Sequence, residues 1–154
     1  KPDIKSFKVH NDINYMGVIN CYCAFIKKLI KKKRGQILIM SSITAWIGLP
    51  KASAYGPTKS ALKSFAESIR YDLNKINIDV KLCSPGFVNT DAVKVNNFKM
   101  PGLIEPEFAA KKIIKDLKSK KFEITFPFFF SLFMKILSLI PDKFSYFIIN
   151  KGAN

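Results

Sequence analysis

The sequence is poor in residues that bind metals or form disulfides. It has one histidine, His10, and three cysteines, of which Cys21 and Cys23 lie two positions apart. On a helix that spacing directs the two thiols to nearly opposite sides. An odd number of cysteines and a lone histidine exclude a disulfide framework and a zinc cluster. We therefore expect no metal site, and we expect a reducing, cytoplasmic compartment.

Arginine and acidic residues are also scarce. The chain has 26 basic and 11 acidic residues, and Arg34 and Arg70 are its only arginines, so the net charge of +15 comes almost entirely from lysine. A nucleic-acid-binding protein gathers its charge with aromatic side chains on one face and commonly reads bases with arginine. Here the lysines are spread along the chain. The composition therefore argues against a nucleic-acid partner.

Neither a signal-peptide core nor a long uninterrupted apolar run is found. The most apolar segment, residues 126–141, contains Lys135 and is too short for a convincing membrane-spanning helix. The 154 residues fit one modest domain. Because the chain opens on Lys1 without an initiator methionine, we expect it to be a piece of a longer polypeptide.

Helical and strand patterns alternate along the chain. Helices show apolar residues three and four positions apart, and strands show short, nearly continuous apolar runs typical of a sheet buried on both faces. Such alternation predicts an α/β fold, a parallel sheet with helices on both faces. The predicted helices span about 11–33, 54–75 and 105–117, and the predicted strands span 36–41, a run from Ile78 that ends at Pro85-Gly86, and 122–126.

The stretch SAYGPTKSAL, residues 53–62, places a tyrosine and a lysine four positions apart at the start of a helix. Tyr55 and Lys59 then share one helical face. A nearby ammonium favours the ionised phenol, which suits proton transfer to a carbonyl oxygen or from an alcohol. The spacing alone also fits a packed tyrosine beside a solvated lysine. Ser42, at a strand end 13 residues before Tyr55, favours a functional pair, because strand ends hold the sites of open α/β sheets.

Four motifs in this order resemble those of the short-chain dehydrogenases/reductases. They are NYMG with Asn14, GQILIMSS with Ser42, YGPTK, and PGFVNT at residues 85–90, and the likeness runs from about Asn11 to about Phe126. The resemblance implies a Rossmann-like, doubly wound parallel sheet of which this chain holds the second half. It divides the chain into residues 1–126, which belong to that sheet domain, and an apolar helical tail over 127–154.

The resemblance also assigns catalytic roles. It implies that Tyr55 is the general acid/base and that Ser42 orients the substrate oxygen, with Ser41 as the second choice. It implies that Lys59 lowers the pKa of the tyrosine and holds the nicotinamide ribose. Asn14 would anchor a water molecule in a proton relay.

A further set of residues is implied to bind NAD or NADP. Besides Tyr55 and Lys59, the resemblance places Pro85, Gly86, Val88 and Thr90 beside the nicotinamide, and it makes residues 91–102 part of a substrate lid. On the residues alone, PGFVNT also fits an ordinary Pro-Gly turn after a strand.

The sequence departs from the family in its first residues. No glycine-rich G-x-x-x-G-x-G turn and no Asn-Asn-Ala-Gly stretch occur, although the family binds the pyrophosphate at such a turn. We therefore expect the isolated chain to bind dinucleotide poorly and to turn nothing over. The choice between NAD and NADP stays open, because the residue beside the adenine ribose belongs to the missing half.

The implied function is an NAD(P)-dependent oxidoreductase that interconverts a carbonyl and a secondary alcohol on a small, apolar substrate, as a homodimer or homotetramer. A non-catalytic fragment and a membrane-surface protein are the alternatives. The tail follows the lysine-rich residues 118–121, and two interpretations of it are open. It is either a helix that lies on an anionic membrane, which would make the cytoplasmic protein a peripheral membrane protein, or a wall of the substrate pocket.

Overall fold

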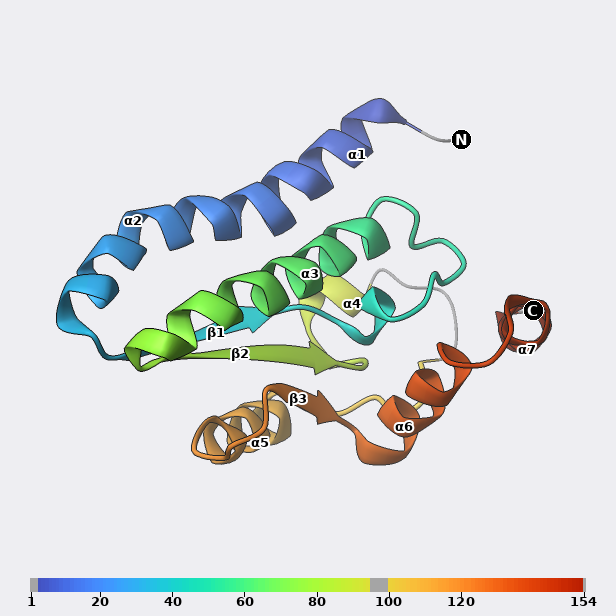
Figure 1. Ribbon diagram of the computed structural model, residues 1–154. Helices are drawn as coiled ribbons and strands as arrows, with labels where there is room; N and C mark the ends of the chain where they lie inside the picture. The colour runs from blue at the N-terminus through green and yellow to red at the C-terminus, as the bar shows by residue number, and fades with distance from the viewer. Residues whose placement is uncertain (1–2, 95–99, 154) are drawn as a thin grey trace.

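A computed structural model describes residues 3–94 and 100–153 of the chain. Its centre is a three-stranded parallel sheet in the order β1 (Gly35–Met40), β2 (Ile78–Pro85) and β3 (Glu123–Phe126), with helices on both faces (Figure 1). Gly35 pairs with Ile78 at one end of the sheet, and Pro85 pairs with Phe126 at the other. The carboxyl ends of the three strands therefore lie along one edge, as the predicted α/β fold requires.

Two long helices cover the first face of the sheet. The chain begins with α1 (Ile4–His10), η1 (Asn11–Met16) and α2 (Gly17–Lys32), which form one continuous helical stretch, and α3 (Gly56–Leu73) runs beside it (Figure 1). They bury a shared core with β1 and β2, whose fully buried members include Ile39, Leu62, Ala66, Leu73, Ile78, Val80 and Leu82. Short η3 (Asn74–Ile76) follows α3 and leads into β2.

Helix α5 (Pro106–Leu117) covers the opposite face. Its Ala109 packs with Cys83 of β2 and Ile124 of β3. Cys83 alternates along β2 with Leu82, which belongs to the core shared with α3. The connections β1–α3–β2 and β2–α5–β3 thus both lead to the next strand on the same side, but α3 and α5 lie on opposite faces of the sheet. They have opposite hands, so one of them departs from the right-handed rule for such crossovers.

The last residues form α6 (Phe128–Leu137) and α7 (Asp142–Ala153) beyond β3 (Figure 1). Met134 and Leu137 of α6 are buried with Ile43, which belongs to the short helix η2 (Ile43–Ala45) after β1. The tail therefore packs against the loop that follows the first strand. In residues 3–94 and 100–153, no helix is both long and apolar enough to cross a bilayer.

The helix before β1 differs most from the sequence prediction. It begins at Ile4 and not near residue 11, because the Asp3 carboxylate caps it by accepting a hydrogen bond from the Lys5 N–H at 3.1 Å. Within it, residues 11–16 are π-helical, and the Gly17 N–H donates to the Asp12 carbonyl five residues earlier. The other predicted boundaries agree with the structure to within about two residues.

Candidate functional site

Ser42 and Tyr55 are joined by a loop that leaves β1 and returns to α3. Ser42 has an extended backbone and its Oγ accepts a hydrogen bond from the Thr44 N–H at 3.2 Å, which starts η2. Tyr55 immediately precedes α3, whose first turn contains Pro57, a residue suited to that position. The fold thus sets both hydroxyls at the carboxyl end of β1.

The Tyr55 phenol is half-buried beside Ser42 and Lys59. Burial raises the pKa of the phenol above its ordinary value, and a hydrogen bond with the Ser42 side chain acts in the opposite direction. The Lys59 Nζ lies 5.4 Å from the centre of the Tyr55 ring. Desolvation of the phenol outweighs the hydrogen bond with Ser42, and the expectation that Lys59 lowers this pKa stays a prediction.

Lys59 is fixed to the end of the first strand. Its Nζ donates to the Met40 carbonyl oxygen at 3.0 Å, and burial lowers the pKa of its ammonium. The Lys59 carbonyl in turn accepts a hydrogen bond from the Ser41 Oγ at 2.9 Å. Ser41 is thus engaged with the helix backbone, whereas Ser42 is the serine that meets the Tyr55 hydroxyl.

Asn14 reaches the same helix through Thr58, a residue that the sequence analysis did not single out. The Asn14 Nδ2 donates to the Thr58 Oγ at 3.3 Å, and that hydroxyl donates to the Tyr55 carbonyl at 2.7 Å. Asn14 lies in the π-helical segment, a feature often found at functional sites. The only sequence signal for Thr58 was its place inside YGPTK, between the tyrosine and the lysine.

Gly86 is explained by close packing of the chain. Its N–H donates to the Phe126 carbonyl at 2.7 Å, directly after Pro85 ends β2. A Cβ at this position would lie 3.1 Å from the Phe130 ring and 3.2 Å from Pro127 Cδ. A side chain here would therefore push α6 away from the loop.

Val88 occupies an extended position with its own backbone groups turned outward. It forms a parallel bridge with Ile104, in which Asn89 N–H donates to the Ile104 carbonyl at 2.8 Å and Ile104 N–H donates to the Phe87 carbonyl at 3.1 Å. Because the bonds to Ile104 use the residues on either side of Val88, its own N–H and C=O point to the opposite side.

Thr90 and the predicted lid follow this bridge. Thr90 is exposed, and its carbonyl accepts a hydrogen bond from the Val93 N–H at 3.0 Å, within α4 (Asp91–Lys94). Residues 95–99 of the predicted lid, 91–102, lie outside the described residues. The lid's last residue, Gly102, has a φ of 67°, which favours glycine.

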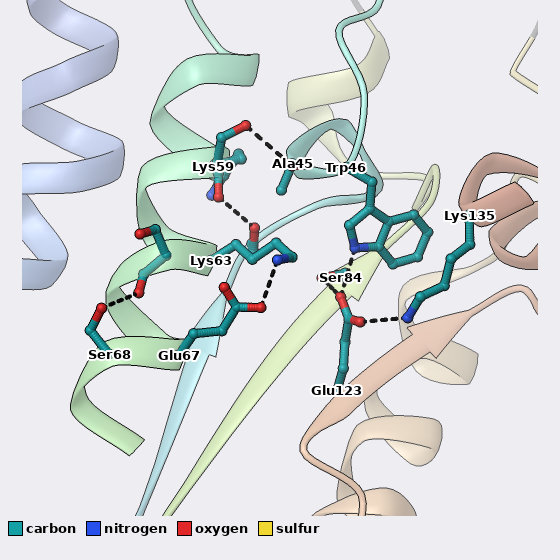
Figure 2. A network of polar contacts seen from close by, with 12 residues as sticks. Ala45, Trp46, Lys59, Lys63, Glu67, Ser68, Ser84, Glu123 and Lys135 are labelled. Carbon is teal, nitrogen blue, oxygen red and sulfur yellow. Dashed lines mark hydrogen bonds and ion pairs between the residues drawn. The ribbon is translucent and has the colours of Figure 1, made fainter. Parts of the chain in front are cut away.

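A partly buried carboxylate secures the loop that carries Ser42. Glu123, whose side chain is 15 % exposed, accepts hydrogen bonds from the Trp46 indole N–H at 2.8 Å and from the Ser84 hydroxyl at 2.7 Å, and it pairs with the Lys135 ammonium at 3.0 Å. Figure 2 shows Glu123 between these three side chains. The interaction joins the loop after β1 to β3 and α6.

The part of the chain that the structure describes contains no group of three or more His, Cys, Asp or Glu side chains able to hold a metal ion. The polar groups gathered at the carboxyl edge are instead hydroxyls, an ammonium, an amide and backbone groups. Such a set can donate, accept and relay protons.

The family model of the short chain dehydrogenases matches residues 3–100. An uncharacterized oxidoreductase of Myxococcus xanthus is 30% identical over 131 residues, which are 85% of this chain and 52% of that protein. A 3-dehydrosphinganine reductase of Danio rerio is 29% identical over 134 residues, 80% of this chain and 40% of that protein. The chain thus spans about half the length, or less, of these relatives.

Solved structures share the fold. A short chain dehydrogenase from Burkholderia cenocepacia in complex with NADP superposes with a TM-score of 0.84 at 20% identity, covering 96% of this chain and 62% of that one. A 3-oxoacyl-[acyl-carrier protein] reductase from Brucella melitensis superposes with a TM-score of 0.68 at 22% identity, covering 81% of this chain and 53% of that one. At these identities the likeness concerns the fold.

Proposed function

The chain belongs to the short-chain dehydrogenase family, and from this membership we propose that the whole protein is an NAD(P)-dependent oxidoreductase that interconverts a carbonyl and a secondary alcohol on a small, apolar substrate. One observation carries the proposal: Ser42, Tyr55 and Lys59 meet at the carboxyl end of β1. Sites of doubly wound sheets lie along that edge.

In this proposal Tyr55 moves the proton. Its raised pKa keeps the phenol protonated near neutral pH, so it donates a proton to a carbonyl oxygen in the reducing direction. Ser42, which hydrogen-bonds with the phenol, orients the same substrate oxygen. Lys59 holds its ammonium beside the Tyr55 ring, where a positive charge stabilises the phenolate that remains after the transfer.

The residues of the carboxyl edge fit a nicotinamide nucleotide. When bound, NAD or NADP supplies the hydride donor or acceptor. The outward N–H and C=O of Val88 form a donor–acceptor pair suited to a carboxamide, and the Lys59 ammonium suits ribose hydroxyls. The other residues proposed to line this part of the site are Tyr55, Pro85, Gly86 and Thr90.

Asn14 is proposed to hold a water molecule that connects the site to solvent. The π-helical segment and the Thr58 hydroxyl fix its amide nitrogen, which leaves the amide oxygen as the group for such a water. Thr58 would then be a positioning residue, since it acts on Asn14 and on the Tyr55 backbone.

The proposal also concerns the activity and the oligomeric state of the chain. Residues 1–154 alone are expected to be inactive, because they contain no glycine-rich turn for the pyrophosphate. We also propose that the helices bearing Asn14 and Tyr55 pair with their copies in a dimer or tetramer. Exposed Ile13 and Phe25, at 68% and 64%, support this pairing.

The test uses the whole protein, with its nucleotide-binding half, and the variant Tyr55→Phe. Removing the hydroxyl should lower kcat by at least about a hundredfold, whereas the Kd for the nucleotide should change little, because only the proton carrier is lost. Tyr71→Phe, in the same helix and 75% exposed, is the matched control and should be unaffected. Unchanged turnover by Tyr55→Phe would contradict the mechanism.

A further inference from the structure

The outer surface of the last two helices is strongly apolar. Ten large apolar side chains there are between 39% and 84% exposed, and Phe129 and Leu139 are the most exposed at 84% and 81%. We call this set the apolar tail face: Phe128, Phe129, Leu132, Phe133, Ile136, Leu139, Phe144, Tyr146, Phe147 and Ile148. Scattered apolar residues are ordinary at a surface, but a gathering of this size marks an interaction site.

Helix α6 is apolar on two sides. Ser131, Met134 and Leu137 face inward and are buried, as the three-residue spacing requires. Phe128, Leu132 and Ile136 recur every four residues and remain exposed. Since residues four apart lie one above the other, these three form one bare stripe. Packing within the described chain thus accounts for the inner side of α6 and leaves the outer side without a partner.

We propose that the apolar tail face docks on the surface of an anionic lipid bilayer. Aromatic side chains dominate it, and such side chains insert at the boundary between headgroups and acyl chains. Residues 127–153 contain three lysines and one carboxylate, and the whole chain has a charge of +15, which complements anionic headgroups. With 10 and 12 residues, α6 and α7 lie along a bilayer surface and do not cross it.

Further polypeptide of this fold would pack against the β1 edge of the sheet, and the tail lies at the β3 edge. Helices α2 and α3 cover the same face of the sheet. A strand that precedes α1 in the chain, and is connected to β1 through α2 with the same handedness as β1–α3–β2, would therefore lie beside β1, on the side away from β2. The tail is at the other edge, where α6 contacts β3. A completed sheet would therefore leave the apolar tail face bare.

The inner side of α6 contacts both loops of the candidate site. Met134 packs with Ile43, which follows Ser42, and the Phe130 ring stacks on Phe87 with centres 5.7 Å apart. A bilayer at the outer side would thus lie one helix away from these loops. An apolar substrate could then enter the site from the bilayer. This entry route depends on the proposed function, whereas the docking itself does not.

The test is sedimentation of the full chain with phosphatidylcholine vesicles, with and without phosphatidylserine. The chain should bind the anionic vesicles more strongly. The triple variant Phe129→Ser, Leu139→Ser and Phe147→Ser should bind at least about tenfold more weakly, because each apolar side chain contributes a transfer free energy to insertion. Ile4→Ser with Ile114→Ser, which are 71% and 61% exposed on α1 and α5, is the matched control and should bind like the unchanged chain.

Circular dichroism checks that the triple variant keeps its helices. Equal vesicle binding by the triple variant and the unchanged chain, or no binding by the unchanged chain, overturns the proposal. The proposal is also overturned if the unchanged chain forms a dimer that the triple variant abolishes while vesicle binding stays the same, because the apolar tail face would then join two copies of the chain. Measured on the whole protein, binding without turnover overturns only the proposed function, and turnover without binding overturns only the docking.

Discussion

Thr58 connects the two sides of the candidate site through a single hydroxyl. Thr58→Val keeps the shape of the side chain but leaves the Asn14 amide nitrogen without its acceptor. It also removes one hydrogen bond to the Tyr55 carbonyl, which still accepts from the backbone N–H groups of Thr58 and Lys59. Because Thr58 is only 6% exposed, we expect unfolding to become easier by about 1–3 kcal/mol. In the whole protein, kcat should fall while KM changes little. Urea denaturation and steady-state kinetics measure the two effects.

The conservative variant Thr58→Ser is the control for this prediction. It retains the hydroxyl and should restore most of kcat and of the stability, although it lacks one methyl group. A structural role alone would change stability and leave kcat intact. Equal kcat values for the valine and serine variants would show that Thr58 does not position Asn14.

The residues of the site were predictable where their relation is local. Tyr55 and Lys59 are four apart on one helix, so their shared face follows from helical geometry. Asn14 and Thr58 are 44 positions apart, and nothing in the sequence indicates their hydrogen bond. The raised pKa of Tyr55 was also missed, because burial depends on the whole fold.

Glu123 connects separate elements, since its carboxylate contacts the loop after β1, the strand β2 and the helix α6. Glu123→Ala would leave the partly buried Trp46 indole N–H and the buried Ser84 hydroxyl without this acceptor. We expect a loss of at least about 2 kcal/mol in the free energy of unfolding. Urea denaturation followed by the fluorescence of Trp46, the single tryptophan, measures this loss.

The matched control for Glu123→Ala is Glu67→Ala, which also removes a carboxylate paired with a lysine. Figure 2 shows both pairs. Glu67 is 43% exposed and bonds Lys63 one turn away at 2.6 Å, so its removal should cost about 0.5 kcal/mol or less. Similar losses from the two variants would contradict the view that Glu123 holds three elements together.

At the scale of elements, local signals located most boundaries. Pro57 and Pro106 stand in the first turns of α3 and α5. The basic run before Gly35 marks the end of α2, but the residue with the left-handed backbone there is Lys33, and Gly35 is the first residue of β1. The π-helical segment was not predictable, because the apolar residues around Asn14 keep a spacing that an α-helix also satisfies. The bond from Trp46 to Glu123 spans 77 positions and depends on the packing of α6.

At the scale of the whole molecule, the alternation of strand and helix patterns predicted the parallel sheet with helices on both faces. The position of the tail did not follow from the sequence, since residues 126–141 are strongly apolar, with Lys135 as their one charged residue, and the sequence alone does not separate an inner from an outer side. The structure separates them: Met134 and Leu137 pack inward, and Phe129 and Phe133 remain exposed. Both interpretations of the tail stay predictions, and they concern different sides of the same helix.

The stability of the whole molecule should depend on one buried thiol at alkaline pH. Burial raises the pKa of Cys83 from 9.0 to about 12, and the carboxylates of Glu123 and Asp116 act in the same direction. Between these values the unfolded chain releases the thiol proton and the folded chain retains it. The free energy of unfolding should therefore fall as pH rises above 9, by about 1.4 kcal/mol per pH unit from this group.

Urea denaturation from about pH 8 to about pH 11, a range that includes the ordinary pKa of a thiol, measures this slope. Cys83→Ala is the matched variant. The variant should lose stability at pH 8, because it leaves a small cavity between β2 and α5, but its stability should fall less steeply with pH. Exposed Cys21 and Cys23 remain in both proteins, so they do not contribute to the difference. If both proteins lose stability with the same slope, the Cys83 thiol ionises in the folded chain as readily as in the unfolded one, and the core around it admits a charge.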